Sequence, residues 1–315
     1  FPEGTISRTG HLAEFRKGFE RAAALCNDSV VIVPFYIQGL WGSQFSRASE
    51  QVKNEKRKSL FRDLIIGFGE PLKKSTSSER LKRCVYDLSI KTWQQFIRDQ
   101  QSLGYLWIKK AKFIGRRQLL IDDSQGRYSA FKLLTYSLIW ARRLATHKDS
   151  TIGVMLTTGV SAVALHMAAF ISGKRIINID TTKAPQQITE DLKKIDCSVV
   201  YIDRQLPTGL PSEIKIIDMS KLNVTLWEST LSWLQSRAIP ASLLSRFVGA
   251  RSVDPARGAL IVDSPNGLVE LSHHNIIANC YQIADVLNAQ EDDVVLSDLP
   301  LHQVYGLTVP LLMPL

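Results

Sequence analysis

Short apolar runs alternate with helical patterns from about residue 128 onward. The runs have the length of buried strands and lie at 151–157, 175–179, 198–202, 214–218, 258–262 and 293–297. The segments with helical spacing of apolar residues lie at 128–147, 160–172, 185–195, 221–236 and 272–287, and a last one starts near 304. Alternating strands and helices form parallel sheets covered on both faces. This part is therefore predicted to be an α/β domain with a mainly parallel sheet.

One apolar stretch, residues 152–173, is long enough to cross a bilayer. It contains several polar residues, among them Thr157, Ser161 and His166, and its period changes after the first six residues. A broken period favours a buried strand followed by a helix over one continuous membrane span.

The earlier part of the chain has a different pattern. Apolar residues follow a helical period at 11–27 and 80–103, and strand-like runs lie at 30–37 and 60–68. Pro34 lies inside the first run and indicates an edge or an end of that strand.

Charge divides the chain in a similar way. The 315 residues carry a formal net charge of +9; residues 1–125 hold 22 Lys and Arg against 13 Asp and Glu, whereas residues 126–315 hold 17 of each. We therefore predict residues 1–75 as one domain, 76–125 as a basic helical linker and 126–315 as a second domain. A basic first part fits nucleic acid, anionic lipid or a phosphorylated substrate, and charge alone does not choose among them. The four scattered cysteines exclude a disulfide scaffold and a cysteine-rich zinc site.

The opening segment FPEGTISRTG combines hydroxyl, acidic, basic and glycine residues. The candidate substrate-binding residues are Glu3, Gly4, Thr5, Ser7 and Arg8. Hydroxyl groups and an arginine can bind phosphate oxygens, a glycine allows close backbone approach, and a helix starting near His11 would offer its first amides to an anion. The alternative is a plain loop that caps a helix, because the same residue types are cap formers.

This segment resembles the third motif of the glycerolipid acyltransferases, FPEGTRSR, and VIVPFYIQG near residue 30 resembles their fourth motif. Ile6 departs from the pattern, where an arginine is common. The resemblance implies that residues 1–75 are the C-terminal part of an acyltransferase α/β domain. The family's catalytic His and Asp, four residues apart, are expected before Phe1, so no catalytic residue is assigned here.

A second motif, LIVDSPNGLVELSHHNIIAN at 260–279, combines with LPLHQVYG at 299–306. Together they resemble the adenylate-forming (AMP-binding) synthetases, which implies their N-terminal subdomain with ATP and Mg²⁺ as cofactors. The family's phosphate loop reads TSGSEGxPKGV, and this chain is about four residues shorter there and lacks the lysine. Ser264 and Gly267 are the candidate cofactor-binding residues of this degenerate loop, and Asp263 is expected to repel ATP.

Three histidines near this motif are interpreted as structural. His302 is expected to be a strand-end residue, and His273 and His274 surface residues at a helix start, because neighbours on a helix point apart. No metal ligand is assigned.

The order of the two parts resembles the bacterial bifunctional 2-acylglycerophosphoethanolamine acyltransferase/acyl-(acyl-carrier-protein) synthetase family. That resemblance implies reacylation of a lysophospholipid, acyl carrier protein as a partner, and a membrane surface at the cytoplasmic face of the bacterial inner membrane. The alternative is a catalytically inactive relic or scaffold that retains the AMP-binding fold, so whether the chain is an enzyme stays open. A nucleic-acid binder is disfavoured because no basic run is interleaved with aromatic residues, and a dinucleotide-binding dehydrogenase because no GxGxxG follows residue 151.

Overall fold

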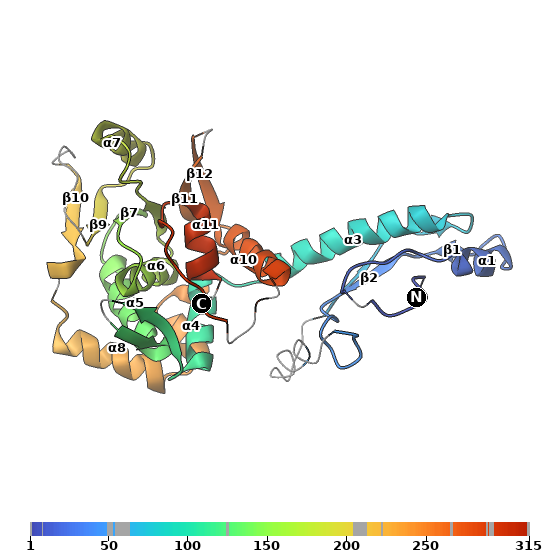
Figure 1. Ribbon diagram of the computed structural model, residues 1–315, viewed down its shortest axis with the longest axis horizontal. Helices are drawn as coiled ribbons and strands as arrows, with labels where there is room; N and C mark the ends of the chain where they lie inside the picture. Colours follow the sequence, from blue (N-terminus) through green and yellow to red (C-terminus); the bar gives the residue numbers. More distant parts are fainter. Residues whose placement is uncertain are drawn as a thin grey trace. The chain divides into compact units, whose positions relative to one another are not determined.

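The computed structural model divides the chain into two compact units, Phe1–Asp99 and Gln100–Leu315. Figure 1 shows both units. The described residues are 2–7, 9–48, 53, 64–123, 126–203, 213–221, 223–264, 267–287, 289 and 293–313. The residues predicted as a linker, 76–125, are shared between the units: a long helix belongs to the first and a shorter one to the second.

The first unit pairs two short antiparallel ribbons with a long helix. Its elements are α1 (Gly18–Ala24), β1 (Val31–Ile32), β2 (Phe35–Gln38), β3 (Ile65–Phe68), β4 (Leu72–Lys73) and α3 (Ser78–Arg98). Strand β1 pairs with β4, and β2 pairs with β3. Helix α3 packs on β2 and β3, and the Ser77 hydroxyl caps it by accepting a hydrogen bond from the Arg80 amide.

Two predictions for this unit are corrected by the structure. The predicted helix at 11–27 begins only at Gly18, because the residues before it form a loop that packs back on the opening segment. The predicted strand at 30–37 is interrupted at Pro34, which has no amide hydrogen to donate to a neighbouring strand. The Pro34 carbonyl instead accepts a hydrogen bond of 2.8 Å from the Gly69 amide.

The second unit is built on one six-stranded sheet. In spatial order its strands are β10 (Lys215–Asp218), β9 (Val199–Ile202), β7 (Thr151–Met155), β8 (Arg175–Asn178), β11 (Gly258–Ser264) and β12 (Gly267–Ser272). The first five run parallel, and β12 runs antiparallel to β11. The mainly parallel α/β sheet predicted from the apolar runs is confirmed. The predicted acyltransferase domain has no such confirmation and stays a prediction.

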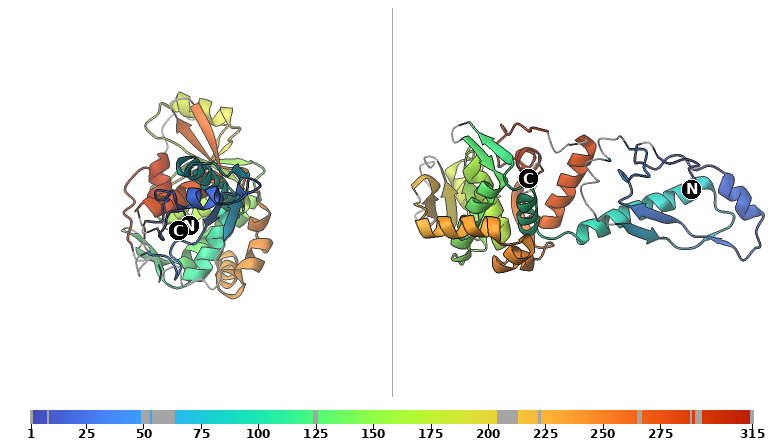
Figure 2. Two further views of the ribbon diagram at one scale, coloured as in Figure 1. Left: turned by 90° about the vertical axis from the view of Figure 1, so that its right-hand side faces the viewer. Right: turned by 90° about the horizontal axis from the view of Figure 1, so that it is seen from below.

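The helices of this unit are α4 (Leu103–Ile114), α5 (Ala130–Ala145), α6 (Val160–Ser172), α7 (Pro185–Lys194), α8 (Leu226–Ala238), α9 (Ala241–Phe247), α10 (His273–Leu287) and α11 (Val304–Leu307). Helices lie on both faces of the sheet, because residues of α5 and α6 pack on one face and residues of α7 on the other. Figure 2 shows the unit from two further sides. Short helical turns follow at Met219–Lys221, Ala250–Ser252 and Thr308–Leu312, and β5 (Gln118–Asp122) forms a hairpin with β6 (Gly126–Ser129).

The main core lies between the sheet and the helices α4, α5 and α6. Helix α6 is mostly apolar around its circumference, and nearly every one of its residues is therefore buried, with Leu165, Phe170 and Ile171 fully inaccessible. The stretch 152–173 is therefore a strand and a buried helix, as predicted. No helix in the described part of the chain has both the length and the apolar character needed to cross a membrane.

One predicted strand of the second unit is wrong. Residues 293–297 are irregular, and Val294 and Leu296 are exposed. Strand β12, and not the segment 293–297, takes the sheet position beside β11. The β5–β6 hairpin and helix α9 were not predicted.

Candidate functional site

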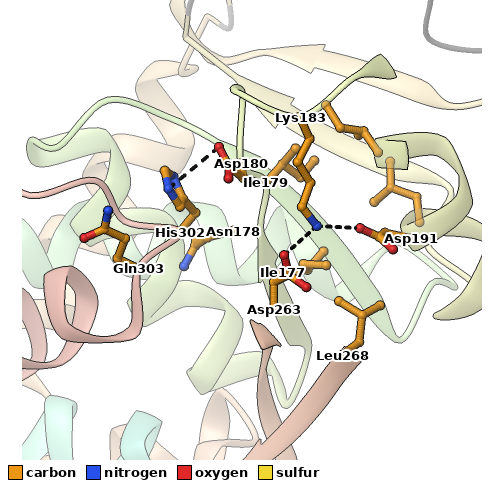
Figure 3. A pocket seen from close by; sticks show the side chains of 12 residues that line it. Ile177, Asn178, Ile179, Asp180, Lys183, Asp191, Asp263, Leu268, His302 and Gln303 are labelled. Atoms are coloured by element: carbon orange, nitrogen blue, oxygen red, sulfur yellow. Dashed lines mark hydrogen bonds and ion pairs between the residues drawn. The ribbon is translucent and has the colours of Figure 1, made fainter. Parts of the chain in front are cut away.

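A cavity of about 320 Å³ opens at the carboxyl ends of β8 and β11. Ligands of open α/β sheets bind at these ends, where loops leave the strands. Figure 3 shows the polar side chains that line the cavity. They are Asn178, Asp180, Lys183, Asp191, Asp263, His302 and Gln303.

Lys183 is the central cation of this cavity. Its Nζ lies 2.8 Å from Asp191 Oδ2 and 2.5 Å from Asp263 Oδ2, so one ammonium joins two carboxylates from different elements (Figure 3). Burial lowers the pKa of Lys183, but the hydrogen bonds to Asp191 and Asp263 outweigh burial and raise it above its usual value. Lys183 therefore stays charged, and its ammonium group is already paired with two carboxylates of the protein.

Asp180 is the centre of a second set of polar contacts in the cavity. Burial raises its pKa, but hydrogen bonds of 2.9 Å from the Thr182 amide and 2.7 Å from the Thr182 hydroxyl, together with the charges of His302 and Lys183, lower the pKa below its usual value. His302 Nε2 lies 3.7 Å from Asp180 Oδ1. His302 thus lies at the cavity beside a carboxylate. The sequence predicts a strand-end residue here and gives no sign of this contact.

A buried histidine sets the orientation of Asn178. His166 is fully buried, and burial lowers its pKa, so the ring is neutral. Its Nδ1 lies 2.7 Å from the Ala162 carbonyl oxygen, which can only accept, so Nδ1 carries the proton and Nε2 is an acceptor. The side-chain amide of Asn178 lies 2.9 Å from His166 Nε2. When Asn178 Oδ1 faces the ring, two acceptors meet and Asn178 Nδ2 has no hydrogen-bond partner. The consistent arrangement turns the amide so that its nitrogen donates to His166.

The predicted phosphate loop is a tight hairpin. Ser264 and Gly267 are directly paired across β11 and β12, with two residues between them, so the structure does bring these candidates together. The Ser264 hydroxyl donates to the Gly267 carbonyl over 2.8 Å, and Gly267 has a φ of +106° that favours glycine. The loop itself, residues 265–266, lies outside the described residues. A hairpin of this length has too few amides to surround a triphosphate.

Carboxylates occupy two further places where a phosphate could bind at this edge. Asp122 Oδ2 accepts a hydrogen bond of 3.2 Å from the Val160 amide at the start of α6. Asp203 Oδ2 accepts one of 2.7 Å from the Thr157 amide. With Asp180, Asp191 and Asp263, this edge of the sheet is acidic, and the residues present do not fit a nucleotide triphosphate. Within the described ranges, no group of three His, Cys, Asp or Glu side chains is placed to hold a metal ion.

The interpretation of His273 as a surface residue is wrong. His273 is 1% exposed, its Nδ1 accepts a hydrogen bond from the Leu103 amide, and its ring packs edge-on against Phe170. Burial, and then the charge of His274, lower its pKa from 6.5 to about 4. His274 Nε2 donates to the Gln100 carbonyl over 3.1 Å. Both histidines therefore join α10 to the start of α4.

The opening motif belongs to the first unit. Glu3 Oε1 accepts a hydrogen bond of 2.7 Å from the Ala13 amide, and Ser7 Oγ accepts one of 3.0 Å from the Gly10 amide and donates to the His11 carbonyl. Gly4 has a φ of +70°, and a Cβ there would lie 2.9 Å from the Arg16 side chain. Thr5 is exposed.

These contacts place the motif in a loop whose amides are partly occupied by its own side chains. Arg8 lies outside the described residues. The helix expected near His11 is absent from this position, so its amides do not form the anion site proposed from the sequence. The predicted roles of Glu3, Gly4, Thr5, Ser7 and Arg8 in substrate binding stay predictions.

No family model matches the chain. A curated relative, the 2-succinylbenzoate–CoA ligase of Staphylococcus aureus (strain Newman), is 20% identical over 216 residues, which is 64% of this chain and 44% of the relative. The chain thus spans less than half the length of this relative.

Solved structures support the same fold. VinN in complex with L-aspartate matches with a TM-score of 0.54 and 16% identity, over 69% of this chain and 61% of VinN. The N-terminal subdomain of Klebsiella oxytoca NpsA, in complex with 3-hydroxyanthranilyl-AMSN, matches with a TM-score of 0.51 and 14% identity, over 70% of this chain and 54% of NpsA. The second unit has an adenylate-forming synthetase-like fold, with a mainly parallel sheet that matches the N-terminal subdomain of these synthetases. The chain is a distant relative of ligases such as 2-succinylbenzoate–CoA ligase.

Proposed function

We propose that this chain is part of a phospholipid acyltransferase/acyl-carrier-protein synthetase whose synthetase-like unit binds ATP poorly. The protein would reacylate lysophospholipid, with 2-acylglycerophosphoethanolamine as the acceptor, at the cytoplasmic face of the bacterial inner membrane. Two features support this proposal: the order of the two motifs in the sequence, and the synthetase-like fold of the second unit. ATP, Mg²⁺ and acyl carrier protein belong to the proposal by family resemblance.

The observation that best supports weak ATP binding is the β11–β12 hairpin. Its closing residues, Ser264 and Gly267, bind each other. Among the described residues that line the cavity, the one ammonium is that of Lys183, and it is paired with Asp191 and Asp263. A triphosphate brought here would find few amides and several carboxylates. It would also have to compete for Lys183 with two carboxylates that are already in place.

Calorimetry with the 315-residue chain tests this part of the proposal. We expect no measurable heat of binding when MgATP is titrated in, with circular dichroism and a cooperative thermal transition showing that the protein is folded. A dissociation constant in the micromolar range would contradict the proposal. The Asp263→Asn variant is a useful comparison, because it removes one carboxylate from Lys183 and shows whether charge or loop length is the main obstacle.

The transferase part is tested in the natural protein. We expect Glu3→Ala and Arg8→Ala to lower acyl transfer to 2-acylglycerophosphoethanolamine, because Glu3 holds the loop through the Ala13 amide and Arg8 is the cation of the motif. His11→Ala is the matched control, since only the backbone of His11 bonds to Ser7 and Thr9. Unchanged kinetics in both motif variants would contradict the assignment.

A second candidate is a catalytically inactive scaffold that keeps the AMP-binding fold. The closed hairpin favours it for the second unit. A natural protein that folds, binds no ATP and transfers no acyl group would support this candidate over the first.

A further inference from the structure

Helix α8 has an apolar face that points to solvent. Leu226 is 88% exposed, Trp227 72%, and Trp233 and Leu234 51% each. The spacing i, i+1, i+7 and i+8 places these four side chains on one stripe of the helix, with the exposed Thr230 between them. Figure 1 shows α8 lying along the outside of α5.

The opposite face of α8 is polar and buried. Ser232 and Ser236 are fully inaccessible. The Ser232 hydroxyl accepts a hydrogen bond of 2.9 Å from Arg142 Nη1, and the Ser236 hydroxyl lies 2.9 Å from the Thr135 hydroxyl. A surface helix normally turns its apolar side to the core, and α8 does the reverse. Since α8 is fixed by these polar contacts, its apolar stripe is free to bind a partner.

Cations gather at the C-terminal end of this stripe. The Arg237 guanidinium lies 4.7 Å from the Trp233 ring and 5.5 Å from the Phe131 ring. Lys112 Nζ donates to the Gln235 carbonyl over 2.9 Å, and burial together with the nearby charge of Arg237 lowers its pKa to about 8. Arg116 in turn lowers the pKa of Arg237, after the effect of burial. These positive charges are close enough to repel one another, so an anionic partner would relieve the repulsion.

The one carboxylate of α8 does not offset these charges. Glu228 Oε1 and Oε2 each lie 2.9 Å from the Arg143 guanidinium, which belongs to α5. Its charge is thus used inside the unit, and the exposed stripe itself carries no acidic side chain. The surface formed by the stripe and the three cations is apolar and positively charged.

We propose that this surface, formed by Leu226, Trp227, Trp233, Leu234 and the cations Lys112, Arg116 and Arg237, docks on an anionic lipid bilayer. The tryptophans and leucines enter the boundary between headgroups and acyl chains, and the cations pair with headgroup phosphates. A second copy of the same surface is disfavoured because it would bring the three cations against three others. This inference does not depend on the proposed acyltransferase activity.

Vesicle flotation with the 315-residue chain tests the proposal. The vesicles are phosphatidylcholine alone, and phosphatidylcholine with about a third phosphatidylglycerol as the anionic probe. We expect binding to the anionic vesicles that weakens as salt is raised. Trp227→Gln combined with Leu234→Gln should lower the partition coefficient by about tenfold or more, because two apolar side chains leave the lipid. Arg237→Gln should lower it only on anionic vesicles.

The matched control is Val286→Gln combined with Leu287→Gln, which removes two exposed apolar side chains from the end of α10. We expect its partition coefficient to stay within about twofold of the unaltered protein, because these residues lie outside the stripe. Circular dichroism checks that all variants fold. The control also shows whether any loss of exposed apolar area has the same effect.

Four results would overturn the proposal. One is failure of the unaltered protein to bind anionic vesicles at low salt, and another is an equal loss in the α10 control. The third is sedimentation of the unaltered protein as a dimer that the α8 variant dissociates, with vesicle binding unchanged, which would assign the stripe to a second copy. Binding of an acidic protein such as acyl carrier protein through the stripe, without vesicle binding, would likewise overturn it.

Discussion

Lys183 Nζ lies 2.5 Å from the Asp263 carboxylate, and this ion pair joins the segment after β8 to the end of β11. The same ammonium binds Asp191 on α7. One side chain therefore connects three elements at the edge of the sheet where a ligand of an α/β fold would enter (Figure 3). The pairing gives Lys183 a structural role and explains why two adjacent carboxylates are tolerated.

Replacing Lys183 tests that structural role. Lys183→Met should lower the free energy of unfolding by about 1 kcal/mol, because it leaves two partly buried carboxylates without their cation. Urea unfolding at neutral pH measures the change. Lys194→Met is the control: Lys194 lies 3.6 Å from Asp191 and its side chain is 65% exposed, so its loss should change stability little. Equal effects of the two substitutions would argue against a special role for Lys183.

The buried His273 should make stability depend on pH. Its pKa is lowered from 6.5 to about 4 in the folded protein, so the unfolded chain takes up a proton between these values that the folded chain does not. The contribution of His273 to the free energy of unfolding is therefore fully present above pH 6.5. It is lost as the pH falls towards 4, and the loss amounts to about 3 kcal/mol.

The His273→Asn variant isolates this contribution. Its side-chain oxygen can still accept the hydrogen bond from the Leu103 amide, but it does not titrate. Comparing denaturant unfolding of the two proteins at pH 7 and pH 4.5 removes the effects of His166 and the carboxylates, which both share. Identical pH slopes would show that His273 is not the group responsible.

Thr225 fixes the start of α8. Its hydroxyl accepts a hydrogen bond of 3.2 Å from the Glu228 amide, and Glu228 Oε2 accepts one of 3.0 Å from the Thr225 amide. Thr225→Ala should cost about 1 kcal/mol of stability, because it leaves helix amides unpaired. Thr230→Ala, at an exposed position of the same helix, should be neutral or slightly stabilising. Thermal unfolding of both variants measures the difference, and a Thr225→Ala variant as stable as Thr230→Ala would show that the cap is unimportant.

The protonation of His166 can be read directly. We expect ¹⁵N NMR to show a neutral ring with the proton on Nδ1, because Nδ1 faces the Ala162 carbonyl and burial lowers the pKa. Asn178→Leu should cost about 1–3 kcal/mol, since Nε2 then has no donor. A ring protonated on Nε2 at neutral pH would mean that the Asn178 oxygen faces it.

The fold of the second unit could be predicted well because its central strands β7 and β9 are buried on both faces. Runs such as 152–156 and 199–202 are apolar throughout, and the helices between them repeat with a period that a sequence shows directly. The prediction was wrong at 293–297, where the apolar residues Val294 and Leu296 are exposed and the segment joins neither edge of the sheet. An apolar run specifies the tendency to form a strand, but pairing depends on which neighbour is already in place.

The site was less predictable for a related reason. The shortened loop at 264–267 was visible in the sequence because a motif of known length was missing residues. Lys183 was not singled out, although it lies five residues after β8, because its partners are 8 and 80 positions away along the chain. Local sequence carries no signal for such pairs. The burial of His273 was missed because it depends on α4 and α6 packing against α10.

The sequence by itself determined the alternation of strands and helices, the contraction of the phosphate loop and the concentration of positive charge in residues 1–125. Each of these is a property of neighbouring residues or of composition. Only the tertiary structure decided that Lys183 is held by two carboxylates, that His273 is buried and that α8 turns its tryptophans outward. These depend on contacts between distant segments, and the free energy of such contacts exists only when the chain has folded.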